Sequence, residues 1–269
     1  MRLAHTIGFV GAGKMASAMI GGLLESRTAE PAQIRCTCGD DPTGPALAER
    51  TGIHFDARAA DLAAASDILV LACKPQQFDQ LDPALPASLG PGLVISILAG
   101  TRLSRIAERF PLARNSIRAM PNTPGQIGAG ITAYASLKPL DPADQTAARA
   151  VLGALGTVLA VIEDELDAVT AVSGSGPAYV FEFTAALAEA GCNVGLAPET
   201  ALELARQTVL GAARLMEATG EAPDTLRDNV TSPGGTTAAA LQSFEADHFR
   251  AVVDRAVAAA TARSRELGQ

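Results

Sequence analysis

Short apolar segments alternate with stretches of helical periodicity through the first half of the chain, and this alternation constrains the fold more than any other feature. Parallel strands need a crossover between them, usually a helix, so the pattern is typical of a parallel sheet covered by helices. We expect strands at Thr6–Val10, Ile34–Cys38, Asp67–Ala72, Leu93–Leu98 and Ser116–Met120, with two further short strands at Ile131–Ala135 and Val158–Val161. The expected helices between the main strands are Met15–Leu24, Pro45–Arg50, Ala60–Ala65, Gln77–Leu81 and Leu103–Arg109.

The pattern changes after Glu163, where strand-like segments stop and long alanine-rich helices begin. These helices are expected at Ala178–Ala190, Pro198–Ala218, Thr236–Phe244 and Phe249–Glu266. We therefore predict an α/β chain of two domains: a Rossmann-type parallel-sheet domain at residues 1–162 and an all-helical domain at residues 163–269. Apolar residues such as Leu202, Ala205 and Leu215 recur at helical spacing, so one face should be buried. Abundant alanine suits helices that intertwine with a second copy, although alanine also favours helix formation by itself.

The composition excludes several classes of function. The 269 residues have a formal net charge of −8 and no basic run, which argues against binding to a nucleic-acid backbone. No apolar run reaches the ~20 residues of a membrane helix, and the N-terminus does not resemble a signal peptide, so we expect a cytoplasmic protein with no membrane partner. The cysteines and histidines show no metal-ligand spacing, so no metal site is predicted, and Cys36 and Cys38 are expected to be buried thiols.

The first expected strand leads directly into G-x-G-x-x-A at Gly11–Ala16. In a dinucleotide-binding loop, Gly11 makes the tight turn and Gly13 lets a pyrophosphate approach the backbone, while the small Ala16 permits close packing of helix on strand. The motif is short and common. The expected strand before it and helix after it favour dinucleotide binding over a purely structural turn.

The choice of cofactor depends on Gly39-Asp40-Asp41, which follows the second expected strand. An acidic side chain there accepts a hydrogen bond from the ribose 2′-hydroxyl of NADH and repels the 2′-phosphate of NADPH. Asp40 or Asp41 would act in this way, yet both residues also suit the start of the next helix. Lys14 or Arg35 would offset the repulsion of a phosphate, so the sequence leaves NADH and NADPH as alternatives.

Two later strands end in residues that suit a ligand site. Cys73 and Lys74 follow one of them, and Ala99 and Gly100 follow the next. Open α/β sheets bind ligands at the carboxyl ends of their strands, so these residues should lie near the glycine loop. Gly100 would let the backbone approach a nicotinamide ring.

The stretch Val230–Thr237, with sequence VTSPGGTT, is poorly explained by core packing because it has no large apolar side chain after Val230. Its two glycines expose backbone N–H groups, and it leads into an alanine-rich helix. N–H groups at the N-terminus of a helix form an anion site. A capped loop between two helices would use the same residue types, so the stretch alone does not decide between the two interpretations.

Five segments together make the chain resemble the pyrroline-5-carboxylate reductases, in that family's order and spacing: Gly11–Ala16, Leu71–Gln76, Arg118–Pro124, Ser173–Tyr179 and Val230–Thr237. The resemblance covers essentially the whole chain. It implies a Rossmann domain, a helical dimerisation domain, and an active site at the interface of a homodimer that can assemble into a larger homo-oligomer. The implied reaction is the reduction of 1-pyrroline-5-carboxylate, a cyclic imine carboxylate, to L-proline by hydride transfer from NADPH or NADH, the last step of proline biosynthesis.

The motifs and the resemblance together give a set of candidate site residues. Cofactor binding is expected at Gly11, Ala12, Gly13, Lys14, Met15, Asp40, Cys73, Lys74, Ala99, Gly100 and Asn229. Substrate binding is expected at Ser232, Gly234, Gly235, Thr236 and Thr237. The resemblance implies two catalytic residues, namely Thr237 near the substrate nitrogen and Glu163 as an acidic residue near the substrate.

Three positions depart from the usual pattern of the family. Lys14 stands where Asn or Gln is frequent, and Asp40-Asp41 replace a more neutral or basic loop, so both leave the cofactor choice open. Ala222 stands where the family often has His, which removes one proton donor. A protonated imine is already electrophilic, so we expect catalysis by positioning more than by acid chemistry.

Two alternative functions use parts of the same pattern. A β-hydroxyacid dehydrogenase shares the plan of a Rossmann domain with added helices, but it needs a lysine base on the first long helix of the second domain. The last lysine in this chain is Lys138, well before that helix. A non-catalytic dinucleotide sensor would keep the glycine loop but would not need the SPGGTT sequence.

Overall fold

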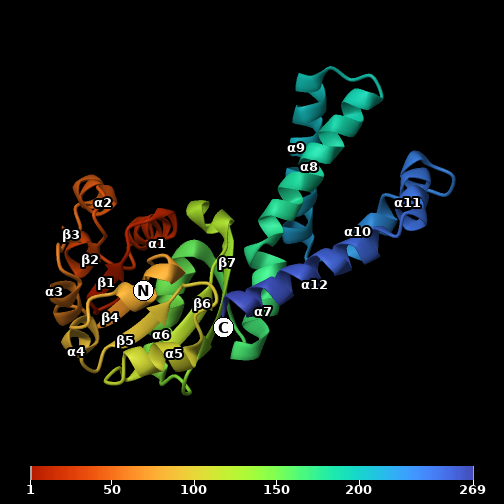
Figure 1. Ribbon diagram of the computed structural model, residues 1–269. Coiled ribbons are helices and arrows are strands. Elements are labelled where there is room, and N and C mark those ends of the chain that lie inside the picture. Colours follow the sequence, from red (N-terminus) through yellow and green to blue (C-terminus); the bar gives the residue numbers. More distant parts are fainter. Residues whose placement is uncertain (1, 269) are drawn as a thin grey trace. The chain divides into compact units, whose positions relative to one another are not determined.

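The computed structural model describes residues 2–268, which form two compact units (Figure 1). The sheet unit comprises the described residues up to Ser175 together with those from Ala260 onward, and the helical unit comprises Gly176–Ala259. The chain therefore leaves the sheet unit once and returns to it at its C-terminal end.

The sheet unit is built on an eight-stranded sheet in the order β3-β2-β1-β4-β5-β6-β7-β8. Its strands are β1 (Ile7–Val10), β2 (Ile34–Thr37), β3 (His54–Phe55), β4 (Ile68–Leu71), β5 (Leu93–Ser96), β6 (Asn115–Met120), β7 (Gly130–Ser136) and β8 (Gly156–Ala160). Neighbouring strands pair in parallel except for β6 and β7, which are antiparallel. The predicted fold, a mostly parallel Rossmann-type sheet followed by helices, is confirmed.

The helices of the sheet unit are α1 (Lys14–Glu25), α2 (Thr43–Thr51), α3 (Ala59–Ala64), α4 (Leu85–Leu89), α5 (Leu103–Arg109), α6 (Pro142–Leu152) and α7 (Leu166–Val169). Four of the predicted helices are present as α1, α2, α3 and α5. The fifth, Gln77–Leu81, corresponds to a 3₁₀ segment, Pro75–Gln80. The sequence did not predict helices α4, α6 and α7 or the two-residue strand β3. A strand of two residues is too short to show any periodicity in the sequence.

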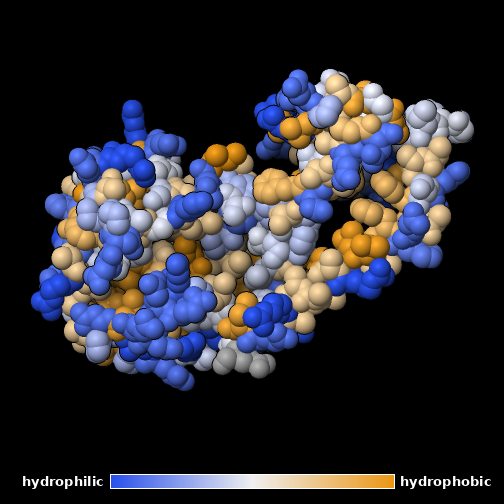
Figure 2. Space-filling model, turned by 45° about the horizontal axis from the view of Figure 1, so that its top comes forward, coloured by the Kyte–Doolittle hydropathy of each residue, from blue (hydrophilic) through white to orange (hydrophobic). Residues whose placement is uncertain are grey.

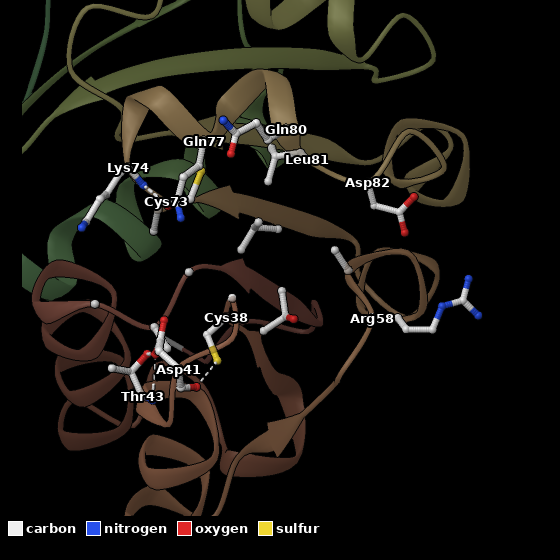
Figure 3. A pocket seen from close by; sticks show the side chains of 18 of the residues that line it. Cys38, Asp41, Thr43, Arg58, Cys73, Lys74, Gln77, Gln80, Leu81 and Asp82 are labelled. Carbon is white, nitrogen blue, oxygen red and sulfur yellow. Dashed lines mark hydrogen bonds between the residues drawn. The ribbon is translucent and has the colours of Figure 1, made fainter.

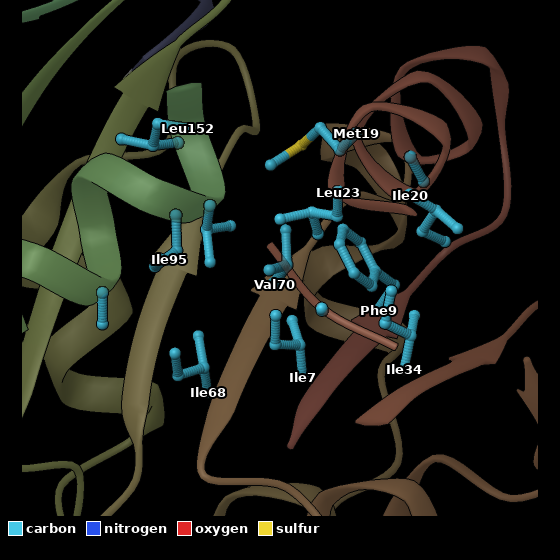
Figure 4. Packing of buried hydrophobic residues seen from close by; sticks show 14 of the residues in the cluster. Ile7, Phe9, Met19, Ile20, Leu23, Ile34, Ile68, Val70, Ile95 and Leu152 are labelled. Atoms are coloured by element: carbon cyan, nitrogen blue, oxygen red, sulfur yellow. The ribbon is translucent and has the colours of Figure 1, made fainter. Parts of the chain in front are cut away.

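Alternation along the strands gives the sheet an apolar core on each face. Ile7 and Phe9 of β1 contact the first core, which includes Met19 and Leu23 of α1 (Figure 4). Val10, the next residue along β1, belongs to the second core with residues of α3 and α5. Successive side chains of a strand point to opposite faces, so a single apolar strand contributes to both cores. Burying each large apolar side chain stabilises the fold by about 1.5–3 kcal/mol.

The helical unit consists of α8 (Gly176–Asn193), α9 (Pro198–Thr219), α10 (Pro223–Asn229), α11 (Thr236–Ala246) and the larger part of α12 (Phe249–Leu267). Helices α8 and α9 pack against each other, and Gly191 approaches Ala201 so closely that a Cβ added to the glycine would lie 3.1 Å from the alanine Cβ. Within this described unit, the buried hydrophobic residues are Ala188, Ala201 and Ala205. None of the described helices is long and apolar enough to span a membrane.

All four cysteines are free thiols, and their burial differs. Cys36 is buried, as expected from the sequence. The expectation that Cys38 is also buried is wrong: this residue is half-buried, and its Sγ donates to the backbone carbonyl of Asp41 at 3.2 Å. The strand β2 ends at Thr37, so Cys38 lies in the following turn and does not share the strand's buried face. Among residues 2–268 there is no group of three His, Cys, Asp or Glu side chains that could hold a metal ion.

Candidate functional site

The loop between β1 and α1 has a backbone geometry that requires glycine. Gly11 has φ +114°, and a Cβ there would lie 2.5 Å from the carbonyl oxygen of Ala72. A Cβ at Gly13 would meet nothing within 4 Å, so the space beside this residue is open. Gly13 is the N-cap of α1 and provides no side-chain hydrogen bond to it. The first N–H groups of α1 therefore remain available to an anion, and the loop fits the pyrophosphate of a dinucleotide.

A cleft of about 650 Å³ opens beside this loop, at the carboxyl ends of β1, β2 and β4 (Figure 3). We call it the sheet-edge cleft. Its charged and thiol-bearing lining residues are Cys38, Asp41, Arg58, Cys73, Lys74 and Asp82. Five predicted cofactor residues also lie along it, namely Gly11, Ala12, Gly13, Cys73 and Lys74. Open α/β sheets bind nucleotides at this edge, and the volume is in the range of small-molecule sites.

Lys14 and Met15 lie at the start of α1 but do not border the sheet-edge cleft. Lys14 is exposed and lines a neighbouring groove together with Arg50. Met15 is half-buried and packs against the apolar core of the sheet. Arg35, considered from the sequence as a cation that could offset a phosphate, is paired with Asp56 at 2.6 Å between Nη2 and Oδ1. Neither cation therefore lies in the sheet-edge cleft.

The two acidic residues after β2 have different environments. Both side chains are exposed, but Asp41 borders the sheet-edge cleft and Asp40 lies outside its lining. Oδ1 of Asp41 accepts hydrogen bonds from the Thr43 N–H, at 2.9 Å, and from the Thr43 hydroxyl. These two bonds, with a smaller contribution from the charge of Lys74, lower the pKa of Asp41. Thr43 is the first residue of α2, whose N-cap is Pro42, so Asp41 accepts from the first N–H of that helix and also presents a negative charge to the cleft.

The ends of β4 and β5 provide the other predicted cofactor residues of the sheet unit. Burial raises the pKa of the Cys73 thiol to about 11, so this group is protonated at neutral pH and is not a nucleophile. Ala99 is exposed, while Gly100 is buried with φ +75°. A Cβ on Gly100 would lie 2.9 Å from the carbonyl oxygen of Leu267. The last turn of α12 thus lies against the Ala99–Gly100 loop, and this contact requires glycine.

Glu163 belongs to the sheet unit and has partners of its own. Its Oε1 accepts from the backbone N–H of Leu103, at 2.6 Å, and lies 3.4 Å from Nη1 of Arg118. Arg118 is buried in β6 and also pairs with Asp167 at 3.4 Å, while Asp167 accepts from the hydroxyl of Ser264 in α12 at 2.9 Å. The carboxylate of Glu163 therefore holds the start of α5 and shares a buried cation.

The segment Ser232–Gly235 of the helical unit forms a tight turn. The N–H of Gly235 donates to the carbonyl of Ser232 at 3.0 Å, and Gly234 has φ +72°. Pro233 followed by a glycine with positive φ is the signature of a type II turn. Gly235 is the N-cap of α11 and gives it no side-chain hydrogen bond, and the first capping bond to its carbonyl comes from Ala239, at 3.1 Å.

The turn leaves the N-terminus of α11 accessible. The N–H groups of the first helical residues, Thr236 and Thr237, precede the first intrahelical donor and so point out of the helix end. Asn229 is the last residue of α10, and its Nδ2 donates to Glu221 Oε2 at 3.4 Å. The predicted site residues thus fall into two sets: Asn229 and the Ser232–Thr237 residues in the helical unit, and all the others in the sheet unit.

Sequence reasoning did not identify Thr43, Arg58, Arg118 and Asp167 as members of these arrangements. For Arg118 a signal was available, because a charged residue in the middle of an apolar strand needs a buried partner. Asp167 lies one helical turn after Glu163, so both carboxylates were candidates for that partner. No comparable signal marks Arg58, which lines the sheet-edge cleft from the segment before α3.

The chain is similar to known proteins over nearly its whole length. The family model of the pyrroline-5-carboxylate reductase dimerisation region matches residues 163–267, and the model described as NADP oxidoreductase, coenzyme F420-dependent, matches residues 6–100. The pyrroline-5-carboxylate reductase of Synechocystis is 42% identical over 263 residues, which cover 98% of each chain. The structure of the Coxiella burnetii pyrroline-5-carboxylate reductase is similar with a TM-score of 0.93 and 36% identity, covering 99% of this chain and 100% of that one. The Plasmodium falciparum pyrroline carboxylate reductase, solved with NADP bound, covers 100% of both chains with a TM-score of 0.86 and 29% identity.

Proposed function

This chain belongs to the pyrroline-5-carboxylate reductase family, and we propose that it reduces 1-pyrroline-5-carboxylate to L-proline with NADPH or NADH as the hydride donor. Family membership extends over the full length of the chain, so it covers both the nucleotide half and the helical half of the enzyme. The reaction is the last step of proline biosynthesis.

The strongest structural support is the Ser232–Gly235 turn at the N-terminus of α11. A type II turn with no large side chain leaves the N–H groups of Thr236 and Thr237 free, and helix N-termini bind carboxylates through such groups. The substrate is a cyclic imine with one carboxylate. We assign carboxylate binding to Ser232, Gly234, Gly235, Thr236 and Thr237.

The residues around the glycine loop fit the cofactor. Gly11 and Gly13 with Ala12 would hold its pyrophosphate against the start of α1, with Lys14 and Met15 next to them. Cys73, Lys74, Ala99 and Gly100 follow strands β4 and β5 at the same edge of the sheet. When bound, the reduced nicotinamide supplies the hydride. We further assign Asn229 to the cofactor, as the family resemblance implies.

The chain's own residues then have to position the imine. Thr237 carries a hydroxyl in the first turn of α11, next to the N–H groups that would bind the carboxylate, and it would orient the ring nitrogen through a hydrogen bond. Glu163 would favour the protonated imine by its charge. Because Arg118 lies 3.4 Å from the same carboxylate, part of that charge is offset, and we expect Glu163 to contribute less than Thr237.

Assembly into a homodimer is part of the proposal. The helical unit leaves large apolar side chains exposed on several helices, including Phe181 of α8 and Leu204 of α9, which are 67% and 53% exposed (Figure 2). A second copy that buried these side chains would supply the core that the unit lacks. The family model matched by residues 163–267 is that of a dimerisation region, which agrees with this proposal.

Two further parts of the proposal concern organisation and place. We propose that residues 1–162 serve the cofactor and residues 163–269 serve dimerisation and the substrate, as the change of sequence pattern after Glu163 suggests. A biosynthetic reductase that uses a diffusible reduced nicotinamide is expected in the cytoplasm. Localisation of a tagged protein in its native cell would check this.

Oxidation of NADPH and of NADH, followed by absorbance, tests the reaction directly. The enzyme should consume both 1-pyrroline-5-carboxylate and reduced cofactor and form proline in equal amounts. Parallel reactions with buffer and with a β-hydroxyacid plus oxidised cofactor distinguish a non-catalytic sensor and a hydroxyacid dehydrogenase. Turnover in the hydroxyacid reaction alone would contradict the proposal.

A further inference from the structure

Asp40 and Asp41 are adjacent carboxylates, but only Asp41 borders the sheet-edge cleft. We propose that Asp41, and not Asp40, sets the cofactor preference of this enzyme and makes it favour NADH over NADPH. This inference rests on the proposed function, because it places the adenosine end of the cofactor in the cleft.

The carboxylate of Asp41 is held in a defined orientation. Both hydrogen bonds from Thr43 go to Oδ1, and among residues 2–268 no hydrogen bond to Oδ2 is found. Oδ2 is therefore available to accept from the ribose 2′-hydroxyl of NADH. The turn around Asp41 is itself fixed, since the Asp41 N–H donates to the Gly39 carbonyl at 2.8 Å and the Cys38 thiol donates to the Asp41 carbonyl. A preorganised acceptor of this kind discriminates between ligands because little ordering is needed on binding.

The cations near the cleft do not favour a 2′-phosphate. Arg58 and Lys74 are the basic residues of the lining, and Asp41 and Asp82 are the acidic ones, so their charges cancel. Arg58 and Asp82 are seen on one side of the cleft, away from Asp41 and Thr43 (Figure 3). Arg58 also lies 3.9 Å from the carboxylate of Asp61, between Nη1 and Oδ1.

The two cations that the sequence offered as compensation are used elsewhere. Arg35 pairs with Asp56, and Lys14 lines the neighbouring groove. Lys74 brings positive charge to Asp41, but its effect there is smaller than that of the two hydrogen bonds from Thr43. A 2′-phosphate beside Asp41 would thus meet a carboxylate whose charge is only partly offset. A 2′-hydroxyl in the same place would gain a hydrogen bond to a charged acceptor, which is a stronger bond than one between neutral groups.

The test compares the wild-type enzyme with Asp41→Asn and Asp40→Asn. Asparagine keeps the oxygen that accepts from Thr43 and removes only the charge, so Asp41→Asn is expected to retain the start of α2. The dissociation constants of NADH and NADPH are measured by titration without imine, and kcat/KM is measured for both cofactors with 1-pyrroline-5-carboxylate. We expect the wild type to prefer NADH, and Asp41→Asn to shift the preference toward NADPH by about tenfold, which corresponds to about 1.4 kcal/mol. Asp40→Asn should change the ratio by less than about twofold, since Asp40 lies outside the cleft and its charge is screened by salt.

Each of the following results would overturn the inference. The first is a wild-type preference for NADPH, and the second is an Asp40→Asn shift as large as that of Asp41→Asn. The third is a loss of affinity for NADPH, but not for NADH, in Arg58→Ala, which would make Arg58 a ligand of the 2′-phosphate. The inference expects the dissociation constants of NADH and NADPH to change alike in this variant. Because the titrations need no imine, they separate the two proposals. If the wild type prefers NADH but does not reduce the imine, the proposed function is contradicted. If the enzyme reduces the imine but Asp41→Asn keeps the wild-type preference for NADH, this inference is contradicted.

Discussion

The sheet unit and the helical unit bury their apolar side chains to very different degrees. Strands β1, β4 and β5 have all of their side chains buried, and both faces of the sheet are covered by helices. In the helical unit the buried hydrophobic residues described are three alanines, while phenylalanines and leucines of α8 and α9 remain exposed. The sheet unit therefore has a complete core within one chain. The helical unit leaves large apolar side chains exposed, and in the proposed homodimer a second chain would cover them.

This difference also explains the periodicity of α9. The sequence predicts one buried face that includes Leu202, Ala205 and Leu215. Within a single chain Ala205 is buried, but Leu202 and Leu215 are 49% and 48% exposed. Periodicity reports that a face is apolar and does not say which molecule covers it. The same signal therefore predicts intrachain packing in the sheet unit and an interface between chains in the helical unit.

The largest expected effect is on stability, which should depend on protein concentration in the helical unit and not in the sheet unit. Phe9→Ala should lower the free energy of unfolding by about 3–5 kcal/mol, since it empties a fully buried site in the sheet core. This loss should not vary with protein concentration. Leu204→Ala should lower the stability of the dimer. The denaturation midpoint of this variant should rise with protein concentration, because dimers are favoured at high concentration. Denaturant titrations at two concentrations check both variants, and equal behaviour of the two would break the comparison.

Within the sheet unit, substitutions of the two loop glycines, Gly11 and Gly13, should affect different properties of the enzyme. Gly13→Val should keep the fold, because a Cβ there meets nothing, but it should weaken cofactor binding on the order of 100-fold by blocking two charge-assisted hydrogen bonds. Gly11→Val should instead lower stability, since it forces a side chain into positive φ against the Ala72 carbonyl. Cofactor titration and thermal denaturation are measured for both variants. A folded Gly13→Val enzyme with normal affinity would remove the pyrophosphate assignment.

Thr237→Ala addresses the helical unit's contribution to chemistry. We expect kcat/KM for the imine to fall by roughly tenfold to 100-fold, the loss of one hydrogen bond to a charged group. The dissociation constant of the cofactor should stay the same, because the glycine loop belongs to the other unit. Thr219→Ala is the matched control, since the Thr219 hydroxyl donates to the Leu215 carbonyl within α9. An unchanged kcat/KM in Thr237→Ala would withdraw its catalytic role.

The smallest expected effect concerns pH and Asp41. The hydrogen bonds from Thr43 lower the folded-state pKa of Asp41, so its contribution to stability is present above its unfolded pKa of about 3.9 and is lost as the pH falls through the folded value. Asp41→Asn should remove this small pH dependence below about pH 4 and lower the stability at neutral pH by a small amount that does not vary with pH. Thermal denaturation of both proteins from neutral to acidic pH measures it. A stability advantage of the wild type that grew as the pH fell below about 4 would have the wrong sign.

The sequence predicted local motifs better than it predicted contacts between residues far apart in the chain. The loop from Gly11 and the Ser232–Gly235 turn are specified by neighbouring residues, because glycine and proline determine backbone angles directly. The distinction between Asp40 and Asp41 depends on how one turn orients two adjacent side chains, which periodicity does not report. The contact of Gly100 with Leu267 joins residues far apart in the chain. No local pattern could have assigned that glycine to the end of α12.

The return of α12 to the sheet unit has a consequence for protein synthesis. Ser264 binds the Asp167 carboxylate that pairs with Arg118, and Leu267 lies against Gly100, yet both residues are translated only after the helical unit, Gly176–Ala259. A nascent chain on the ribosome can form the strands and their covering helices before these contacts exist. The Rossmann half is thus the first to begin folding, but it is completed only after the helical unit has been synthesised. A ribosome stalled while it translates the helical unit would display the sheet without the last turns of α12.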